Sequence, residues 1–147
     1  MTEGIYNKIL VPIDGSEYSK KSLKKAVSFA KMNNCKLLVM NVTEKSIHYG
    51  IQYQRAAQYI HEVLKEESKE IIEDAKTIVN TLDQDIEVEY KIYDGLPAST
   101  ILDVSIKENV DLIIIGTAGR TGVDRFLIGS ITEKIIKSSA IDVLVIH

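Results

Sequence analysis

The sequence predicts a single α/β domain over residues 1–147, built on an open five-stranded parallel sheet with helices on both faces. Two observations predict this fold class. Five short apolar runs recur along the chain, and stretches with the apolar spacing of a helix separate them. The elements therefore alternate between strand and helix, and right-handed crossovers between parallel strands place helices on both faces of the sheet. A length of 147 residues suffices for one domain with a hydrophobic core, and no linker divides the chain.

The predicted strands cover residues 8–13, 36–42, 86–93, 111–116 and 142–147. Four of them contain the nearly continuous hydrophobic segments ILVPI, LLVMNV, LIIIG and VLVI. Such segments are typical of strands that are buried on both faces of a parallel sheet. The segment IEVEYKIY in the third strand alternates apolar and polar residues, which predicts that one face of this strand is wetter.

The first two predicted helices follow the first two strands. Ser16 offers a side-chain oxygen that caps the first helix, and its apolar positions have helical spacing: Leu23, Ala26, Val27 and Ala30. The second helix runs from about residue 55 to 82, after a long polar connection over residues 43–54. Its apolar side consists of Ile60, Val63, Leu64, Ile71, Ile72, Ala75, Ile78, Val79 and Leu82. The segment KEESKE on its other side predicts a solvated face.

The last two predicted helices begin at Pro97 and near Gly129. A proline is well placed at the first position of a helix, because its missing N–H would have no partner there. The apolar face of the third helix contains Ala98, Ile101, Leu102 and Ser105, and that of the fourth contains Ile131 and Ile135.

Composition narrows the class of protein. The net charge is −3 and the 18 Lys and Arg residues are spread along the chain, which argues against nucleic acid as the main partner. No apolar stretch reaches the roughly 20 residues of a membrane-spanning helix, and the first residues lack the layout of a secretory signal. Cys35 is the only cysteine, so an internal disulfide and a cysteine-based zinc cluster are excluded. We therefore expect a cytoplasmic protein with no membrane or nucleic-acid partner.

Two segments at predicted strand ends have the composition of a ligand site. In open α/β sheets, ligands bind at the carboxyl ends of the strands, where the strand order reverses. One segment is Pro12-Ile13-Asp14-Gly15-Ser16, in which Pro12 removes a sheet donor and Asp14 lies beside the resulting opening. The other segment, residues 116–130, has the sequence GTAGRTGVDRFLIGS.

The glycines of the second segment allow two interpretations. Glycine reaches positive φ and lets a ligand approach the main chain, and the N–H groups that open the following helix favour phosphate. Ser130 adds a hydroxyl donor, and Arg120 and Arg125 add charge. The alternative is a tight structural turn with Ser130 as an ordinary N-cap. The spacing matches neither the G-x-G-x-x-G dinucleotide fingerprint nor the phosphate loop of P-loop proteins.

The chain resembles the universal stress protein family, specifically its ATP-binding branch. The family signature G-x2-G-x9-G-[ST] falls on Gly116, Gly119, Gly129 and Ser130 with both spacers of the right length. The segments KILVPIDGSEYS, DGLPASTILDVSIKENVDLIIIGTAGRTG and GSITEKIIKSSAIDVLVIH also resemble family members. The match covers the chain except for residues 46–58. It implies a sheet in which the strands, numbered along the chain, lie in the order 3-2-1-4-5.

The resemblance also implies a role for each matching position. The adenosine end is expected to contact Pro12, Asp14, Val42, Ile115 and Gly116. The phosphates are expected to contact Gly119, Gly129, Ser130 and the N–H of Ile131. ATP is the implied ligand, with Mg²⁺ or Mn²⁺ held on the phosphates themselves and no metal site formed by the protein alone.

Three functions from different classes follow. The leading hypothesis is an ATP-binding regulatory or sensor protein that is not an enzyme. The second is a slow ATPase, for which the loop offers only Thr121 and Asp124 as catalytic groups. The third is a protein-interaction module that works without nucleotide. ADP, AMP and cyclic nucleotides carry phosphate as ATP does and stay open as ligands. The last strand is expected at a sheet edge, where the resemblance implies a homodimer.

Overall fold

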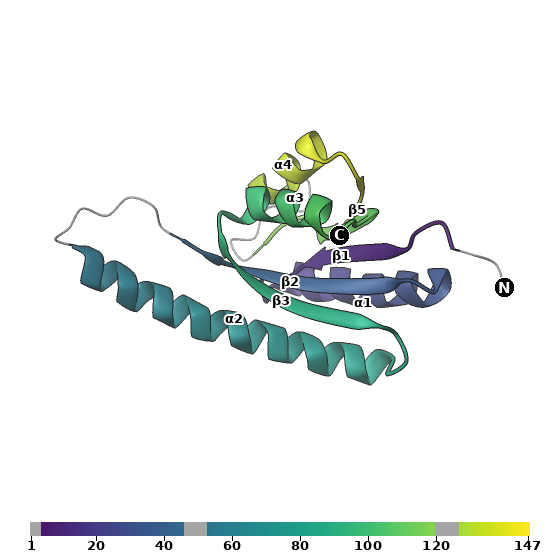
Figure 1. Ribbon diagram of the computed structural model, residues 1–147, viewed down its shortest axis with the longest axis horizontal. Helices are drawn as coiled ribbons and strands as arrows, with labels where there is room; N and C mark the ends of the chain where they lie inside the picture. The colour runs from purple at the N-terminus through teal and green to yellow at the C-terminus, as the bar shows by residue number, and fades with distance from the viewer. Residues whose placement is uncertain (1–3, 46–52, 120–126) are drawn as a thin grey trace.

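The computed structural model describes residues 4–45, 53–119 and 127–147. Its elements alternate along the chain as the sequence predicts (Figure 1). The strands are β1 (Lys8–Pro12), β2 (Lys36–Glu44), β3 (Val88–Gly95), β4 (Leu112–Gly116) and β5 (Asp142–Ile146). The helices are α1 (Glu17–Asn33), α2 (Gln54–Leu82), α3 (Pro97–Lys107) and α4 (Ser130–Ser138). The predicted cap of α1 is confirmed, because the Ser16 side chain accepts a hydrogen bond from Ser19 N.

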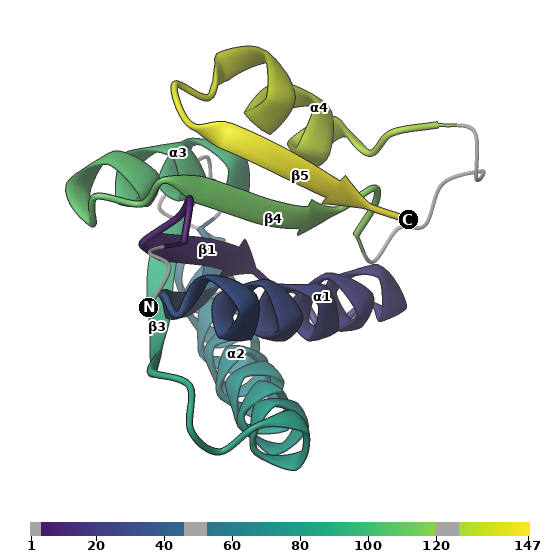
Figure 2. The same ribbon diagram turned by 90° about the vertical axis from the view of Figure 1, so that its right-hand side faces the viewer.

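The strands form one parallel sheet in the order β3-β2-β1-β4-β5, which confirms the predicted order. Helices α1 and α2 cover one face, and α3 and α4 cover the other (Figures 1 and 2). The order reverses at β1, because β2 and β4 flank it on opposite sides.

Side chains of the central strand alternate between two hydrophobic cores. Ile9 and Val11 pack in the core under α1 and α2, whereas Leu10 packs in the core under α3 and α4. All three are fully buried. Burial on both faces explains why this strand appears in the sequence as a continuous hydrophobic run.

Two strands differ from their predicted ranges by two residues, and β1, β4 and β5 differ by one residue at one end. β2 continues through Thr43 and Glu44, which the sequence analysis assigned to a loop, and β3 covers Val88–Gly95 instead of 86–93. The cause is their pairing, which extends from Leu37 opposite Val88 to Glu44 opposite Gly95. Thr43 is consequently buried at the end of the sheet.

The prediction for α2 is right about its extent but wrong about part of its faces. Its 29 residues span about 43 Å, whereas the nine residues of β2 span only about 30 Å. The amino-terminal half of the helix therefore projects beyond the strands (Figure 1). Ile60 and Val63 in this half are half exposed, as is Leu82 at the other end. Conversely, Ser68 within KEESKE is buried, because it hydrogen-bonds Thr43 (Oγ to Oγ1, 2.8 Å).

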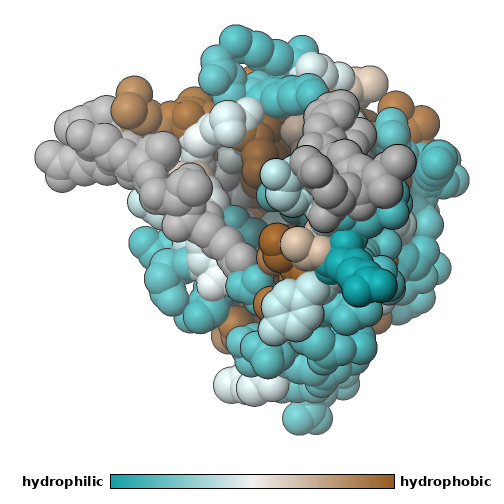
Figure 3. Space-filling view, turned by 90° about the vertical axis from the view of Figure 1, so that its left-hand side faces the viewer, coloured by the Kyte–Doolittle hydropathy of each residue, from teal (hydrophilic) through white to brown (hydrophobic). Residues whose placement is uncertain are grey.

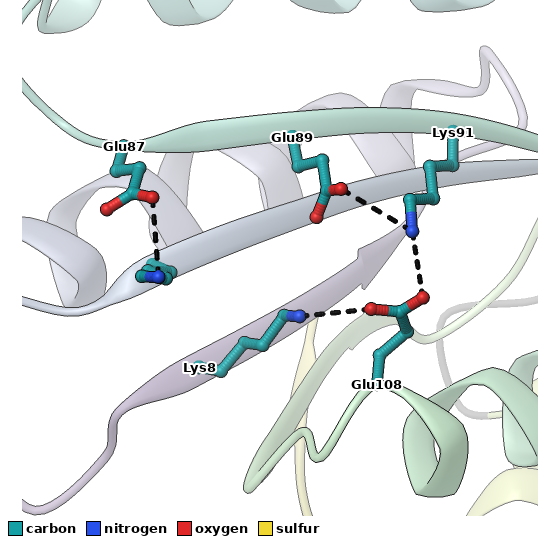
Figure 4. A network of polar contacts seen from close by, with 6 residues as sticks. Lys8, Glu87, Glu89, Lys91 and Glu108 are labelled. Atoms are coloured by element: carbon teal, nitrogen blue, oxygen red, sulfur yellow. Dashed lines mark hydrogen bonds and ion pairs between the residues drawn. The ribbon is translucent and has the colours of Figure 1, made fainter.

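A network of charged side chains joins α3 to β1 and β3 (Figure 4). Glu108, at the end of α3, accepts hydrogen bonds from Lys91 Nζ at 2.8 Å and from Lys8 Nζ at 3.2 Å. Lys91 also lies 3.4 Å from Glu89. The hydrogen bond from Lys91, and then that from Lys8, holds the pKa of the Glu108 carboxyl below its ordinary value.

Candidate functional site

A pocket of about 330 Å³ opens at the carboxyl ends of β1, β2 and β4. Its size falls in the range of roughly 300–1,000 Å³ that is usual for small-molecule sites. It lies where the strand order reverses, which is the place that the fold class favours for a ligand. Figure 3 looks onto this end of the molecule, where hydrophobic residues lie in a hollow among hydrophilic ones.

The nine positions to which the family resemblance assigns a ligand contact all line this pocket. The first group comes from the strands and the turn after β1: Pro12, Asp14, Val42, Ile115 and Gly116. The second group comes from the segments between β4 and α4 and from the start of α4: Gly119, Gly129, Ser130 and Ile131. The fold thus brings together positions up to 119 residues apart in the chain (residues 12 and 131). Their contacts with a ligand stay a prediction.

The turn after β1 holds the Asp14 carboxylate at the edge of the pocket. Ser16 N donates to Asp14 Oδ1 at 2.9 Å, and Asp14 N donates to Ser19 Oγ at 3.4 Å. Gly15 between them has a φ of 84°, a conformation that favours glycine. A hydrogen bond from Ile13 N to Met40 O, at 2.8 Å, ties the same segment to β2.

The signature glycines are explained by close packing and not by positive φ. Within the described residues, only Gly15 and Gly95 are glycines with positive φ, so that part of the prediction is wrong for Gly116, Gly119 and Gly129. A Cβ on Gly116 would lie 2.9 Å from Tyr18 Cβ and 3.0 Å from the Tyr18 carbonyl. The end of β4 therefore approaches α1 more closely than any side chain permits.

The other two glycines bring the parts of the pocket together. A Cβ on Gly119 would lie 2.5 Å from Asp14 Oδ2, so this glycine lets the loop after β4 meet the turn after β1. A Cβ on Gly129 would lie 3.2 Å from Ala118 Cα. The sequence left open a structural role for these glycines, as a tight turn, and the close packing shows that they have one. This role is compatible with a ligand beside the same main chain.

The amino terminus of α4 borders the pocket. Gly129 is the N-cap, and Ser130 is the first helical residue, so the alternative of Ser130 as the N-cap is wrong. The N–H groups of the first helical turn have no acceptor within the helix. Thr132 fixes this terminus, because its Oγ1 donates to Gly116 O at 2.7 Å. Ile131, predicted on the buried face with Ile135, is 39% exposed and contributes to the pocket wall instead.

The opposite side of the pocket is largely apolar but contains two buried polar residues that the sequence analysis missed. Leu64 and Ile71 of α2 line it, together with Asn41 and Thr43 of β2. Asn41 Nδ2 donates to Ile13 O at 2.8 Å, and Thr43 pairs with Ser68. Their signal in the sequence is a pair of polar residues at alternate positions in an otherwise apolar strand.

Four loop residues that the sequence offered as charged or catalytic groups lie outside the described residues: Arg120, Thr121, Asp124 and Arg125. The described ranges contain no group of three or more His, Cys, Asp or Glu residues that could hold a metal ion. None of the helices within these ranges combines the length and the apolar character that crossing a membrane requires.

Comparison with known proteins gives a consistent result. The family model described as "Universal stress protein family" matches residues 5–147. Universal stress protein MJ0531 of Methanocaldococcus jannaschii is 33% identical over 144 residues, which cover 98% of this chain and 84% of that protein. The structure of UspA from Lactobacillus plantarum is 23% identical in sequence and has a TM-score of 0.89. The match covers 100% of both chains.

Some solved structures with this fold contain a nucleotide. The Archaeoglobus fulgidus universal stress protein in complex with dAMP is 20% identical with a TM-score of 0.71, over 97% of this chain and 99% of that one. A universal stress protein with cAMP (22%, TM-score 0.68) and an Arabidopsis thaliana member with AMP (15%, TM-score 0.65) match over at least 90% of both chains.

Proposed function

The chain belongs to the universal stress protein family, and on that premise we propose that it binds an adenine nucleotide in the pocket at the carboxyl ends of β1, β2 and β4. The observation that carries the proposal is the meeting of all four signature residues with the start of α4 at one pocket. Solved structures of the same fold with cAMP, dAMP and AMP support adenine as the base.

The phosphates would lie against the amino terminus of α4. The N–H groups of Ser130, Ile131 and Thr132 have no acceptor within the helix, and they lie at the positive end of its dipole. The Ser130 hydroxyl adds a donor at the exposed rim. One exposed dipole contact is worth only about 0.3–1 kcal/mol, so several donors must act together to hold a polyphosphate.

ATP is the ligand that we propose, with Mg²⁺ or Mn²⁺ on its phosphates. The base and ribose would occupy the apolar side of the pocket, beside Pro12, Val42 and Ile115, with Asp14 and Gly116 near the ribose. This orientation places the apolar part of the nucleotide on apolar side chains and its charge on main-chain donors, as in most ligand pockets.

We propose a regulatory or sensor role for the bound nucleotide. The pocket wall includes Leu64 and Ser68 of α2, so a ligand would touch the long helix as well as the loops. A ligand that binds only one conformation stabilises it by about 2.7 kcal/mol at a concentration 100 times its Kd. The nucleotide concentration would thereby change the population of the ligand-binding conformation, and with it the surface that α2 presents to a partner.

Calorimetry on nucleotide-free protein tests the binding proposal. Titrations with ATP and Mg²⁺, ADP, AMP and cAMP should show saturable heat at one site per chain, and ATP should bind most tightly. Heat from AMP or cAMP alone would retain the adenine nucleotide but contradict ATP as the ligand. No heat from any of the four at high micromolar concentration would contradict the proposal.

A homodimer through β5 is a second part of the proposal. Strand β5 lies at the edge of the sheet, and the four residues from Val143 to Ile146 are only half buried. An apolar edge strand pairs readily with another copy of itself. Sedimentation should give twice the chain mass at micromolar concentration, and a stable monomer would contradict this part.

A further inference from the structure

Strand β3 lies at the edge of the sheet opposite β5, and among the described residues it pairs only with β2 (Figure 1). It covers eight residues, against five in β5. None of its residues is buried, and Ile92 is 38% exposed. A long open edge is a template for pairing with another chain unless its side chains prevent it. The side chains of β3 therefore decide whether this edge takes a partner.

The two faces of β3 differ in chemistry. Val88 and Tyr90 pack against the core under α1 and α2, and Ile92 follows on the same face because side chains alternate along a strand. Glu89 and Lys91 lie on the other face, with Lys91 Nζ 3.4 Å from Glu89 Oε1 (Figure 4). The edge thus carries an apolar row on one face and one charge of each sign on the other.

The main chain of β3 turns every second residue outward. Leu37 N donates to Glu87 O at one end of the pairing with β2, and Lys45 N donates to Gly95 O at the other end. The register between these ends is continuous, with one residue opposite one. Odd-numbered residues therefore direct their N–H and C=O groups toward β2, and even-numbered residues such as Tyr90 direct theirs toward the open edge. An added strand must hydrogen-bond to the even-numbered residues.

We propose that β3 of a second copy of this chain pairs with this edge in the antiparallel direction, centred on Tyr90. In this register even-numbered residues face even-numbered residues, as the hydrogen bonds require. Glu89 then lies opposite Lys91 of the second copy, and Lys91 opposite its Glu89, so both charged pairs are attractive. On the other face, Val88 meets Ile92 and Tyr90 meets its own copy. Every pair is complementary, which is what a two-fold contact between identical chains needs.

The signs of the charges favour pairing over protection of the edge. Charged side chains protect an edge strand when a second copy brings like charges together, but in this register each charge meets its opposite. The surface is separate from the nucleotide pocket, which no residue of β3 lines, so nucleotide binding can fail without affecting it. Because Val143–Ile146 of β5 are all apolar, β3 provides the weaker contact and pairs above micromolar concentration.

A cysteine at the centre of the contact tests the register. Paired Tyr90→Cys chains would have Cα atoms about 5.5 Å apart, within the range that a disulfide spans. Ile92→Cys is the matched control, because its two copies would lie roughly 14 Å apart along the paired strands. Mild oxidation with diamide at high micromolar protein should link Tyr90→Cys into dimers. It should leave Ile92→Cys and the unmodified protein, whose only cysteine is the buried Cys35, unlinked.

Charge reversal tests the same contact without altering the core. Glu89→Lys places a positive charge opposite Lys91 of the second copy and keeps the hydrogen bond from Lys91 to Glu108. The association measured by sedimentation above micromolar concentration should weaken at least about tenfold, because two attractive pairs become repulsive. Glu87→Lys makes the same charge change opposite neutral Tyr93 and should associate as the unmodified protein does.

Each remaining outcome decides the question. Equal cross-linking of Tyr90→Cys and Ile92→Cys, or none in either, would overturn the inference. Association that Glu89→Lys and Glu87→Lys weaken alike would overturn it as well, and so would an unmodified protein that shows no association above micromolar concentration. If Tyr90→Cys fails to fold, the two charge variants decide alone. Pairing through β5 predicts no link at Tyr90→Cys, because β5 lies at the opposite edge of the sheet.

Discussion

Replacing Ser130 with proline removes one main-chain donor from the proposed phosphate site. Proline has no N–H, so the substitution deletes the first amide of α4 together with the Ser130 hydroxyl. Ser130→Ala deletes only the hydroxyl. The difference between the two variants therefore reports what the amide itself contributes to nucleotide binding.

The local backbone suits a proline at this position. Ser130 is the first residue of α4, the position that proline prefers in helices, and α3 of the same chain begins with Pro97. Gly129 before it is extended, with φ −64° and ψ 153°, as a residue before proline should be. The unliganded variant should therefore unfold at nearly the temperature of the unmodified protein. Glu17→Pro at the first position of α1, after extended Ser16, is the matched control for proline at a helix start.

The size of the binding loss follows from the charge of the acceptor. A hydrogen bond to a charged group contributes about 1.5–3 kcal/mol. At about 1.4 kcal/mol per tenfold change, Ser130→Pro should bind ATP roughly 10- to 150-fold more weakly than Ser130→Ala. Glu17→Pro should bind ATP as the unmodified protein does.

The assay is calorimetric titration of the four proteins with ATP and Mg²⁺, with thermal unfolding of each in the absence of ligand. If Ser130→Pro keeps its melting temperature but binds ATP within twofold of Ser130→Ala, main-chain donation at the start of α4 is not what holds the phosphates.

Three further predictions concern stability. Thr132→Val removes the donor to Gly116 O and should cost about 1–2 kcal/mol in urea unfolding; an unchanged midpoint would refute the anchoring role of Thr132. Gly116→Ala places a Cβ 2.9 Å from Tyr18 Cβ and should cost about 1–3 kcal/mol from overpacking, measured by thermal unfolding. An unchanged melting temperature would contradict the close approach of the end of β4 to α1. Because the pKa of Glu108 is lowered in the folded state, its contribution to stability is present above the ordinary carboxyl value of 4.5 and is lost as pH falls through the lowered pKa. Glu108→Gln should therefore be less stable than the unmodified protein at pH 7, and this difference should disappear in acid; a difference that persists at pH 2 would show that charge is not its cause.

The order of elements could be predicted from the sequence because each strand and helix has its own local pattern. The buried run LIIIG and the helix start at Pro97 both depend on residues close in the chain. The gathering of Asp14 and Gly119 at one pocket followed from the rule for open α/β sheets and from the family signature.

Features that depend on packing between distant segments could not be predicted. The need for Gly116 arises from the approach of Tyr18 on α1, which no local pattern records. Ser68 lies in a charged segment of α2, but Thr43 at the end of β2 draws it into a buried hydrogen bond. Ile131 has the spacing of a core residue, yet it lies in the first turn of α4, where the pocket replaces the core.

A crystal structure with ATP and Mg²⁺ bound tests the central claim most directly. We predict phosphate oxygens within hydrogen-bond distance of the N–H groups of Ser130 and Ile131, and the adenine on the side of the pocket formed by Val42 and Ile115. A nucleotide bound elsewhere on the protein, or phosphates with no contact to the start of α4, would contradict the account.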